Sequence, residues 1–587
     1  MHTTQSGDLS LSGYLWCLKP TDERLANTIT QRFDLPDIVA RILAGRGLTL
    51  DNIEDFLNPT LKQHLPNPFS LKDMEKAATR VASSIFAGEP IGLMGDYDVD
   101  GATSTTELKL FLESCGIKVL TFIPEREDGY GPNAKKMQDF KDASCSVVLT
   151  LDCGTTAFEP IDFGTKLGLD IIILDHHNAE ARLPNAYAIV NPKRIDEDNT
   201  HACHHMAACG VVFLFIVALN KILRDQGFWN NKQEPNLIQY LDLVAFGTIC
   251  DVVKLTPVNR LLVKSGLKHL HQCQNIGLNA LARKINIEEA INTYHLGYLL
   301  GPRVNACGRI GKSDLGMKLL SSHDPIEANI LAEELENLNT KRKEIENDVF
   351  FKAIEQIESK PITTPFILVS GENWHQGVVG IVAGRLKERY NLPVFVLSLD
   401  GDNAKGSSRS ISGIDIGTLV MDALTKGILT HGGGHPMAAG FSLQRTQIPD
   451  FIAYLTERIK PEILQHCAHC LDAEGTLDLG GITFDLAQKL ELLAPFGEGN
   501  PEPMFILKNV SVSYTRLLKN GHISVGLTNP RGTKATAIAF RSADTEMGKV
   551  LLASHGQETF DFMITLKKDT WKGLSKVQIQ LLDAKRT

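Results

Sequence analysis

The 587-residue sequence lacks any apolar run of the roughly 18–20 residues that a membrane-spanning helix needs. Its N-terminal segment also lacks the basic stretch followed by an apolar stretch that marks a secretion signal. Low-complexity segments and internal repeats are absent, and glycine and proline occur at ordinary levels. We therefore expect a globular cytoplasmic protein, and at about 100–200 residues per domain its length predicts about three domains.

An excess of positive charge is also lacking, since the formal net charge is −9. A protein that coats nucleic acid with a large non-specific surface would be basic. The charge therefore argues against such a surface. It does not argue against an enzyme that binds nucleic acid in one local groove and carries acidic metal ligands.

The two cysteine pairs that a zinc finger needs are lacking too, because the eleven cysteines are scattered along the chain. Cys467 and Cys470 have a CxxC spacing but no second pair. The segment from His201 to Cys209 crowds its histidines and cysteines too closely for all of them to face one ion. Buried free thiols in a reducing compartment, with ordinary surface histidines, explain both segments better than a zinc site does.

Strand-like apolar runs alternate with helical stretches after about residue 80. The runs are Ile91–Gly95, Lys118–Ile123, Cys145–Asp152 and Asp170–Asp175, and a helix is expected over Thr103–Cys115. Continuous apolar strands separated by helices are typical of a buried parallel sheet. The sequence therefore predicts an α/β fold.

Changes in this pattern divide the chain into five expected segments. They are a helical N-terminal lead-in (1–75), an α/β catalytic domain (76–325), a long helix (326–360), a smaller α/β domain (361–460) and a C-terminal small barrel or sandwich of short strands (461–587). Glycine-rich loops are expected at Gly401–Gly413 and Gly432–Gly434. The long helix either bridges two domains or is an ordinary packed helix.

Acidic residues and histidines directly follow three of the predicted strands. They are Asp96, Asp98 and Asp100 after the first, Asp152 after the second, and Asp175, His176 and His177 after the third. Ligands bind at the carboxyl ends of strands in open α/β sheets, and three such clusters at once are poorly explained as helix caps. Asp251 is a further carboxylate in apolar surroundings, where a lone buried charge is costly and a shared cation would remove that cost.

Carboxylates with one or two imidazoles suit Mn²⁺ or Mg²⁺ better than a soft metal. Two such ions about 3.5–4 Å apart activate water and neutralise a phosphoryl oxygen, so the pattern predicts hydrolysis of a phosphoester or phosphoanhydride, with Asp152 as the bridging ligand. The alternative is an EF-hand calcium loop beginning at Asp96, with Glu107 at its twelfth position. An EF-hand loop follows a helix, whereas a strand is expected before Asp96.

These motifs resemble the DHH phosphoesterase superfamily, named for the triplet seen here as Asp175-His176-His177. Within it, Gly95–Thr105 resembles the first motif of the RecJ family of single-strand-specific 5′→3′ DNA exonucleases. Further segments that resemble this family are Gly301–Arg309, His375–Arg385, Gly406–Ser410, Gly432–His435, Ala438–Phe441 and Gly497–Phe505. The resemblance covers nearly the whole chain from about residue 35.

The resemblance implies a parallel-sheet DHH catalytic domain, a long connecting helix, a smaller α/β DHH-associated domain and a C-terminal OB-like β-barrel. It implies release of 5′-mononucleotides from single-stranded DNA with two Mn²⁺ or Mg²⁺ ions, in DNA recombination and repair. The implied partners are single-stranded DNA with a 5′ end, the single-strand-binding protein and the RecQ helicase. Binding to a membrane is not expected.

The resemblance also implies roles for individual residues. One ion would be held by Asp98, Asp152, His176 and Asp251. The other would be held by Asp96, Asp100 and the shared Asp152, although the alternating triplet permits two registers. His177 would sit at the scissile phosphate, and Asp175 would orient the histidines.

A second set of residues would bind DNA. Arg126, Ser408 and Arg409 would grip the 5′-terminal phosphate, and Tyr130 would stack near the terminal base. Arg303, Asn305 and Arg309, donors without acidic neighbours, would line a phosphate groove, with loop capping as their alternative role. His375 and His435 would line the same cleft. The segment around Arg126 is one residue shorter than is usual in the family, and a surface ion pair with Glu125 or Glu127 is the alternative for this arginine.

Two other functions compete with a single-strand exonuclease. One is a DHH phosphodiesterase that acts on short oligonucleotides or cyclic dinucleotides. The other is a catalytically silent DNA-binding scaffold that has lost its metal ligands. The C-terminal module and the Gly406–Ser410 segment favour long DNA, and the intact set of carboxylates opposes the scaffold.

Overall fold

The computed structural model describes residues 8–126, 129, 131–270, 275–460, 470–554, 558–569 and 576–587. The chain forms two compact units. One consists of Met1–Gln63 together with Ala468–Thr587, and the other consists of His64–Cys467. Among the described residues, no helix is long and apolar enough to cross a membrane.

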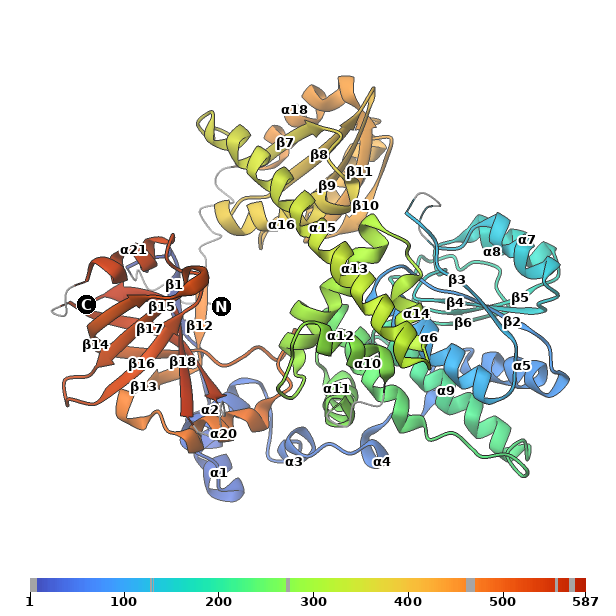
Figure 1. Cartoon of the computed structure of the whole chain (residues 1–587), viewed down its shortest axis with the longest axis horizontal. Coiled ribbons are helices and arrows are strands. Elements are labelled where there is room, and N and C mark those ends of the chain that lie inside the picture. Colours follow the sequence, from blue (N-terminus) through green and yellow to red (C-terminus); the bar gives the residue numbers. More distant parts are fainter. Residues whose placement is uncertain are drawn as a thin grey trace. The chain divides into compact units, whose positions relative to one another are not determined.

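A five-stranded parallel sheet forms the centre of the catalytic part of the second unit (Figure 1). In spatial order its strands are β3 (Val119–Phe122), β2 (Ile91–Met94), β4 (Val147–Leu151), β5 (Asp170–Leu174) and β6 (Ala188–Val190). Every neighbouring pair is parallel, so all five carboxyl ends lie along one edge. The predicted parallel sheet is confirmed, and β6 adds a strand that the sequence did not predict.

Helices cover both faces of this sheet. Figure 1 shows α7 (Ala134–Asp142) and α8 (Phe158–Lys166) on one side and α5 (Met74–Ala87), α6 (Val99–Ser114) and α9 (Ala208–Asp225) on the other. The first ten residues of α6 are all buried, because α9, α10 and α14 pack around this helix. The sheet is thus covered by helices on both faces, and α6 begins just after the carboxyl end of β2.

A second group of helices continues the catalytic part. They are α10 (Leu241–Cys250), α11 (Pro257–Leu270), α12 (Ile276–Lys284), the π-helical turn η3 (His295–Leu300), α13 (Gly301–Ile310) and α14 (Leu315–Ser321). Their apolar side chains share one core, which includes Phe246 and Leu300. This core fixes the ends of α10 and α13 beside the sheet.

The long helix α15 spans Pro325–Glu358 and is capped by Asp324, whose side chain accepts a hydrogen bond from Ile326 N. Its first half contributes Leu331 and Leu335 to the core of the catalytic part. Its second half contributes Val349 and Phe350 to the core of the following domain. The bridging alternative for this helix is therefore confirmed.

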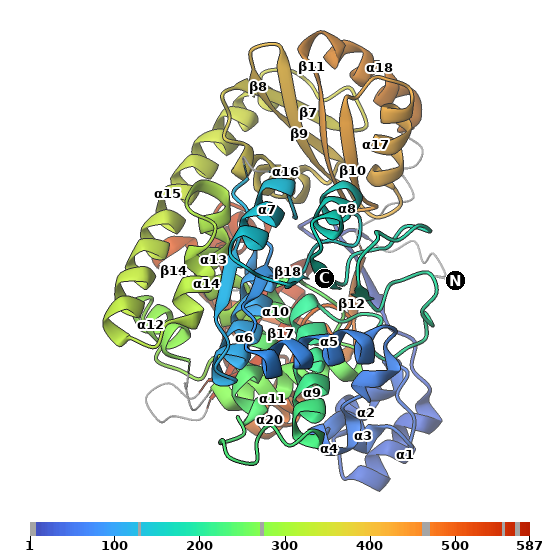
Figure 2. The same cartoon turned by 90° about the vertical axis from the view of Figure 1, so that its right-hand side faces the viewer.

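The smaller α/β domain has a mixed sheet in the order β10-β11-β9-β8-β7. Its strands are β7 (Ile367–Glu372), β8 (Val394–Asp400), β9 (Asn403–Arg409), β10 (His431–His435) and β11 (Ala438–Gln444). Helix α16 (Gln376–Tyr390) packs on one face, and α17 (Ile416–Thr425) and α18 (Ile448–Arg458) pack on the other (Figure 2).

The two glycine-rich segments of this domain differ from the prediction. Both were expected to be loops, but β9 and β10 run through them. A side chain at Gly406 would overlap the ring of Phe441, and one at Gly432 would overlap Val420. These glycines therefore permit close packing across the sheet rather than turns.

The first unit contains a five-stranded barrel, as the OB-like prediction requires. Strands β14 (Phe505–Leu517), β15 (Ile523–Thr528), β16 (Lys534–Ala539), β18 (Lys576–Arg586) and β17 (Thr559–Asp569) pair in that order, and β17 pairs again with β14 to close the ring. The short strand β13 (Gly475–Leu477) lies parallel to β14, and the helices of this region include α20 (Phe484–Leu490) and α21 (Glu546–Ala553).

The N-terminal segment packs on this barrel. Its helices are α1 (Glu23–Phe33), α2 (Asp37–Gly45) and α3 (Ile53–Leu57), and its strand β1 (Leu15–Leu18) pairs in parallel with β12 (Cys470–Ala473). Ile29 and Val39 share a core with Phe505 and Phe560 of the barrel. The N-terminal lead-in thus folds together with the C-terminal module. The sequence predicted them as two separate segments.

Candidate metal centre and nucleic-acid interface

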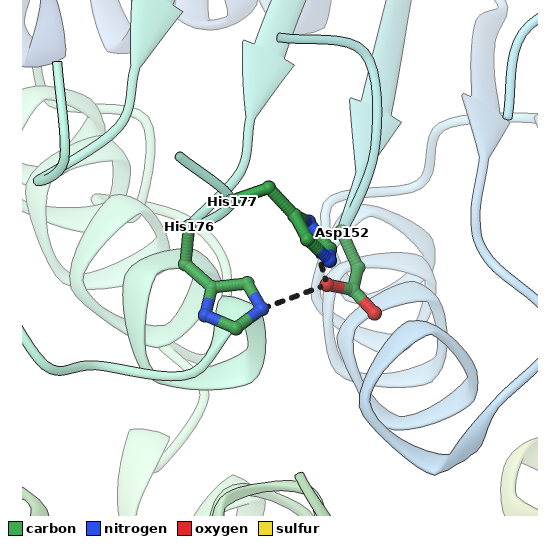
Figure 3. A group of neighbouring side chains, drawn as sticks. All are labelled: Asp152, His176 and His177. Carbon is green, nitrogen blue, oxygen red and sulfur yellow. Dashed lines mark ion pairs between the residues drawn. The ribbon is translucent and has the colours of Figure 1, made fainter. Parts of the chain in front are cut away.

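The three predicted clusters meet at the carboxyl edge of the parallel sheet. Figure 3 shows the rings of His176 and His177 turned toward the same carboxylate oxygen of Asp152. His176 Nε2 lies 3.2 Å from Asp152 Oδ1, and His177 Nδ1 lies 3.8 Å from the same oxygen. Strands β4 and β5 are adjacent, so the residues that follow them are brought together by the sheet itself.

A second group joins His176 to Asp100 and Asp251. His176 Nε2 lies 3.8 Å from Asp100 Oδ2 and 3.6 Å from Asp251 Oδ2. Asp100 is held in place by the start of α9, where Ala208 N and Cys209 N donate to its two oxygens at 2.7 and 2.9 Å. Asp251 directly follows α10 and ends that helix.

A third group consists of Asp96, Asp98 and Asp152, whose ligand atoms lie within 4.8 Å of one another. Asp98 caps α6 and accepts a hydrogen bond from Gly101 N at 3.0 Å. A side chain at Gly101 would overlap the backbone of Asp96, so the turn between β2 and α6 requires glycine here. The turn directs the acidic side chains toward the strand ends.

The grouping differs from the predicted ligand sets in one respect. Asp100, rather than Asp98, lies with His176 and Asp251, and Asp98 lies with Asp96. Asp152 belongs both to the group with the two histidines and to the group with Asp96 and Asp98, which is the position expected of a bridging ligand. In contrast to an EF-hand, a strand precedes Asp96, and Glu107 is fully buried within α6 and belongs to none of these groups.

The donor set fits divalent cations. Asp96 Oδ1, Asp251 Oδ2 and both ring nitrogens of His176 are buried and have no hydrogen-bond partner among the described residues. Buried polar atoms of this kind are costly unless another group binds them. Oxygen-rich ligation with one or two imidazoles suits Mn²⁺ or Mg²⁺, so a pair of such ions would satisfy the atoms that the protein leaves unsatisfied.

Burial and mutual repulsion shift the protonation of these groups. Burial raises the pKa of Asp152 well above its usual value, and the neighbouring charge of Asp100 adds to the rise. The pKa of Asp251 is raised to about 8, first by burial and then by Asp100. Burial lowers the pKa of His176 to about 4, so its ring is neutral and has a lone pair available for a metal.

His177 and Asp175 form a separate pair. His177 Nδ1 lies 2.8 Å from Asp175 Oδ1, which also accepts from the backbone N–H groups of His176 and His177. Burial alone would lower the pKa of His177, but its bond to Asp175 outweighs this and raises the pKa to about 9. Asp175 thus holds His177 as a protonated donor beside Asp152.

The backbone is strained at two of these positions. Asp152 has φ +62° and Val252, next to Asp251, has φ +57°. Residues with a side chain rarely adopt such angles, least of all β-branched ones, and each costs on the order of 1–3 kcal/mol. Strain beside two candidate ligands is typical of a site whose geometry matters for function.

Three arginines converge beside the Asp96–Asp98 turn. Arg126 lies over the ring of Tyr97 at 4.7 Å and donates to Gly308 O at 2.6 Å. Arg309 Nη1 donates to Gly377 O at 3.0 Å, and Arg409 Nη1 donates to Ser408 O at 2.9 Å.

The arginines of this cluster repel one another, and Arg126 attracts the charge of Asp96. Burial, together with the positive charges of Arg126, Arg342 and Arg409, lowers the pKa of Arg309 to about 10. In the described part of the chain, no ion pair within 4.0 Å involves Arg126, Arg309 or Arg409. The predicted alternative for Arg126 is an ion pair with Glu125 or Glu127. No such pair with Glu125 occurs among the described residues, and Glu127 lies outside them. Three guanidiniums together form a binding place for a phosphate.

The remaining predicted DNA-binding residues take different positions. Ser408 is fully buried and donates to Ala439 O, while Ser407 Oγ lies 3.4 Å from Arg409 Nη1. Arg303, expected to lack acidic neighbours, is nearly buried and bound to Glu336, which corrects that expectation. Asn305 Oδ1 accepts from Val99 N at 3.2 Å, so it supports the acidic turn.

His375 and His435 lie at the surface of the smaller α/β domain. His375 caps α16 by accepting from Gly377 N, and His435 is exposed at the end of β10. Tyr130 lies outside the described residues, as does most of the Cys467–Cys470 segment.

Sequence reasoning missed the loop after β6. Asn191 Nδ2 donates to His177 O and to Thr155 Oγ1, both at 2.9 Å, and thereby ties this loop to the candidate centre. Lys193 follows two residues later. Only a predicted strand before Asn191 could have pointed to this loop. The apolar segment there is too short to predict one.

Comparison with known proteins gives three family matches. The DHH family, N-terminal domain, matches residues 90–248, the DHHA1 domain matches 362–461, and the RecJ OB domain matches 473–583. The single-stranded-DNA-specific exonuclease RecJ of Escherichia coli is 35% identical over 80% of this chain and 83% of the relative. The chain belongs to the RecJ family. The RecJ of Bacillus subtilis is 32% identical over 97% of this chain and 70% of the relative.

Solved RecJ structures agree with this assignment. The RecJ of Thermus thermophilus in complex with Mn²⁺ superposes with a TM-score of 0.81 at 26% identity, covering 97% of this chain and 79% of that chain. A RecJ exonuclease bound to manganese superposes with a TM-score of 0.57 at 30% identity, covering 68% and 97%. The RecJ fold therefore extends over both units of this chain.

Proposed function

We propose that this RecJ-family chain is a metal-dependent 5′→3′ exonuclease that releases 5′-mononucleotides from single-stranded DNA. The observation that carries the proposal is the set of three ligand groups at the strand ends, which share Asp152 and His176. Family relatives named as single-stranded-DNA-specific exonucleases support the substrate. Recombination and repair are the processes in which such an activity is expected.

Asp96 and Asp98 would hold one Mn²⁺ or Mg²⁺ ion, Asp100, His176 and Asp251 the other, and Asp152 both. The bound ions would supply an activated water and neutralise charge on the phosphoryl group. His177, protonated through Asp175, would donate a hydrogen bond to an oxygen of the scissile phosphate. The helix starts and the backbone N–H groups that bind Asp100 and Asp175 keep these carboxylates fixed during turnover.

The polarity of cleavage follows from the arginine cluster of Arg126, Arg309 and Arg409. A terminal phosphate monoester carries a charge near −2 at neutral pH, whereas an internal phosphodiester carries −1. Three guanidiniums that form no ion pair with any described residue favour the more highly charged 5′ end. We include Ser407 in this site in place of Ser408, because Ser407 is the serine beside Arg409.

A mutation at the shared ligand tests the proposal. We expect Asp152→Ala to abolish Mn²⁺-dependent release of mononucleotides while circular dichroism shows an unchanged fold. Asp162→Ala, on the outer helix α8, serves as the matched control and should keep full activity. Normal cleavage by Asp152→Ala would refute the two-ion site.

The same assay separates the competing functions. A scaffold releases nothing from any substrate, and an enzyme for short oligonucleotides stalls on long strands. The single-strand-binding protein and RecQ are partners that the family suggests, and direct binding of the purified proteins to this chain tests them.

A further inference from the structure

The segment from His201 to Cys209 stood out in the sequence and has no role in the proposed function. Its cysteines belong to the core, since Cys203 and Cys209 are fully buried and Cys209 Sγ contacts Val244 O. Its histidines do not. The rings of His204 and His205 are half-buried, with centroids 5.0 Å apart.

Hydrogen bonds tie this segment to two other loops. His204 Nδ1 lies 3.3 Å from Pro192 O, which places the segment against the loop after β6. Asn259 Nδ2 donates to His205 O at 2.6 Å and to Lys254 O at 2.7 Å. Lys193, His205 and Lys254 are thereby gathered at one place, and we call them the basic triad.

Each member of the basic triad is linked to the candidate metal centre through the chain or through hydrogen bonds. Asn191 accepts from Lys193 N and donates to His177 O, which links Lys193 to the DHH triplet. Lys254 follows Asp251 by three residues. The segment that carries His205 continues into Ala208 N, which binds Asp100.

The triad has no acidic partner of its own. In the described part of the chain, no ion pair within 4.0 Å involves Lys193, His205 or Lys254. Burial lowers the pKa of His205, and the charges of His204, Lys254 and Lys193 lower it further, in that order. The carboxylates that attract Lys193 are Asp251, Asp175, Asp100 and Asp152, most of which the metal ions would neutralise.

The sheet sets the direction in which this triad lies. Arg126 follows the edge strand β3, and Lys193 follows the opposite edge strand β6. All candidate ligands except Asp251 follow the three strands between them. Four strand spacings of about 4.8 Å separate the two edges by roughly 19 Å. A DNA strand whose 5′ phosphate lies at the arginines and whose scissile phosphate lies at the metals therefore continues toward Lys193.

We propose that the basic triad of Lys193, His205 and Lys254 binds the backbone phosphate on the 3′ side of the scissile phosphodiester. The ligand is an internal phosphodiester of single-stranded DNA. The triad would hold the strand that remains after each cleavage. This inference rests on the proposed function, because it takes the strand to run from the arginines across the metal centre.

Substrates of defined length test the proposal. A 5′-phosphorylated dinucleotide has no phosphate beyond the scissile one, whereas a trinucleotide has one. We expect Lys193→Gln to lower the ratio of kcat/KM for the trinucleotide to that for the dinucleotide by roughly tenfold. A neutral methylphosphonate at the second linkage should lower the wild-type ratio similarly and should not lower the variant's ratio further. Lys193→Arg should restore most of the ratio.

Binding without metal gives a second measurement. For a long single strand in EDTA, Lys193→Gln should reduce the slope of log affinity against log salt by about 0.7, the contribution of one phosphate contact. The control Lys221→Gln lies thirteen residues along α9 from Ala208, about 20 Å away, and should leave the slope and the ratio unchanged.

An unchanged ratio and slope in Lys193→Gln would overturn the proposal. Equal losses on both short substrates would also overturn it, because Lys193 would then act at the scissile phosphate or the metals. Failure of the proposed function gives a different result from failure of this inference. The wild type would then cleave neither substrate in Mn²⁺, while the salt slope in EDTA would still report on phosphate binding by the triad.

Discussion

Replacing Asp251 with asparagine should stabilise the metal-free protein and weaken the effect of Mn²⁺. Asp251 Oδ2 is buried without a hydrogen-bond partner, and the pKa of this carboxyl is raised to about 8. In the unfolded chain an aspartate titrates near 3.9. The folded state therefore loses stability relative to the unfolded state as the pH rises from about 4 to about 8.

The size of this effect follows from the pKa difference. At pH 7 the carboxyl is mostly protonated in the folded chain and ionised in the unfolded chain. At about 1.4 kcal/mol for each pH unit above 3.9, the folded state without metal loses on the order of 4 kcal/mol. Asparagine has the same shape and no charge, so Asp251→Asn should recover much of this, and the gain should vanish toward pH 4.

Mn²⁺ should remove most of the variant's advantage in stability. An ion at one hundred times its dissociation constant stabilises the wild type by about 2.7 kcal/mol, and the variant lacks one carboxylate ligand. Thermal unfolding followed by circular dichroism at pH 7 and pH 4.5, with EDTA or with Mn²⁺, measures all four cases. A variant that is less stable than the wild type in EDTA at pH 7 would refute the reasoning.

Three other substitutions test separate parts of the site. Arg309→Gln should lower the preference for 5′-phosphorylated over 5′-hydroxyl ends by roughly tenfold in competition digests, and an unchanged preference would remove Arg309 from the end-binding site. Ser407→Ala should reduce the same preference, whereas Ser408→Ala should leave it unchanged and lower stability by about 1 kcal/mol, because only its bond to Ala439 is lost. Asp175→Asn should shift the pKa of His177 from about 9 toward 6.5 in an NMR titration in EDTA, and a value that stays near 9 would point to another cause.

Elements with strong local patterns were predictable from the sequence. The buried run Ile91–Met94 could only be an interior strand, and the apolar spacing after Asp324 predicted α15 almost to its observed ends. The strands β9 and β10 were not predictable, because glycine indicates a turn in most sequences. Here Gly406 makes room for Phe441, which lies far away in the chain.

The candidate site was predictable where it depends on strand order alone. Residues that follow adjacent parallel strands must meet, so Asp152 and His176 were placed correctly beside each other. The positions set by distant helices were not predictable. Arg303 lies against Glu336 of α15, and the alternation of β9 turns Ser408 into the sheet while Ser407 faces Arg409.

The most direct test of a 5′→3′ metal-dependent exonuclease is a digestion of a single strand labelled at its 3′ end. With a 5′ phosphate and Mn²⁺, we predict that the labelled strand shortens stepwise from its unlabelled end, while unlabelled 5′-mononucleotides accumulate from the first time point. With EDTA, or with a fully double-stranded substrate, the label should stay at full length. Release of the 3′ label as the first product, or equal digestion in EDTA, would contradict the account.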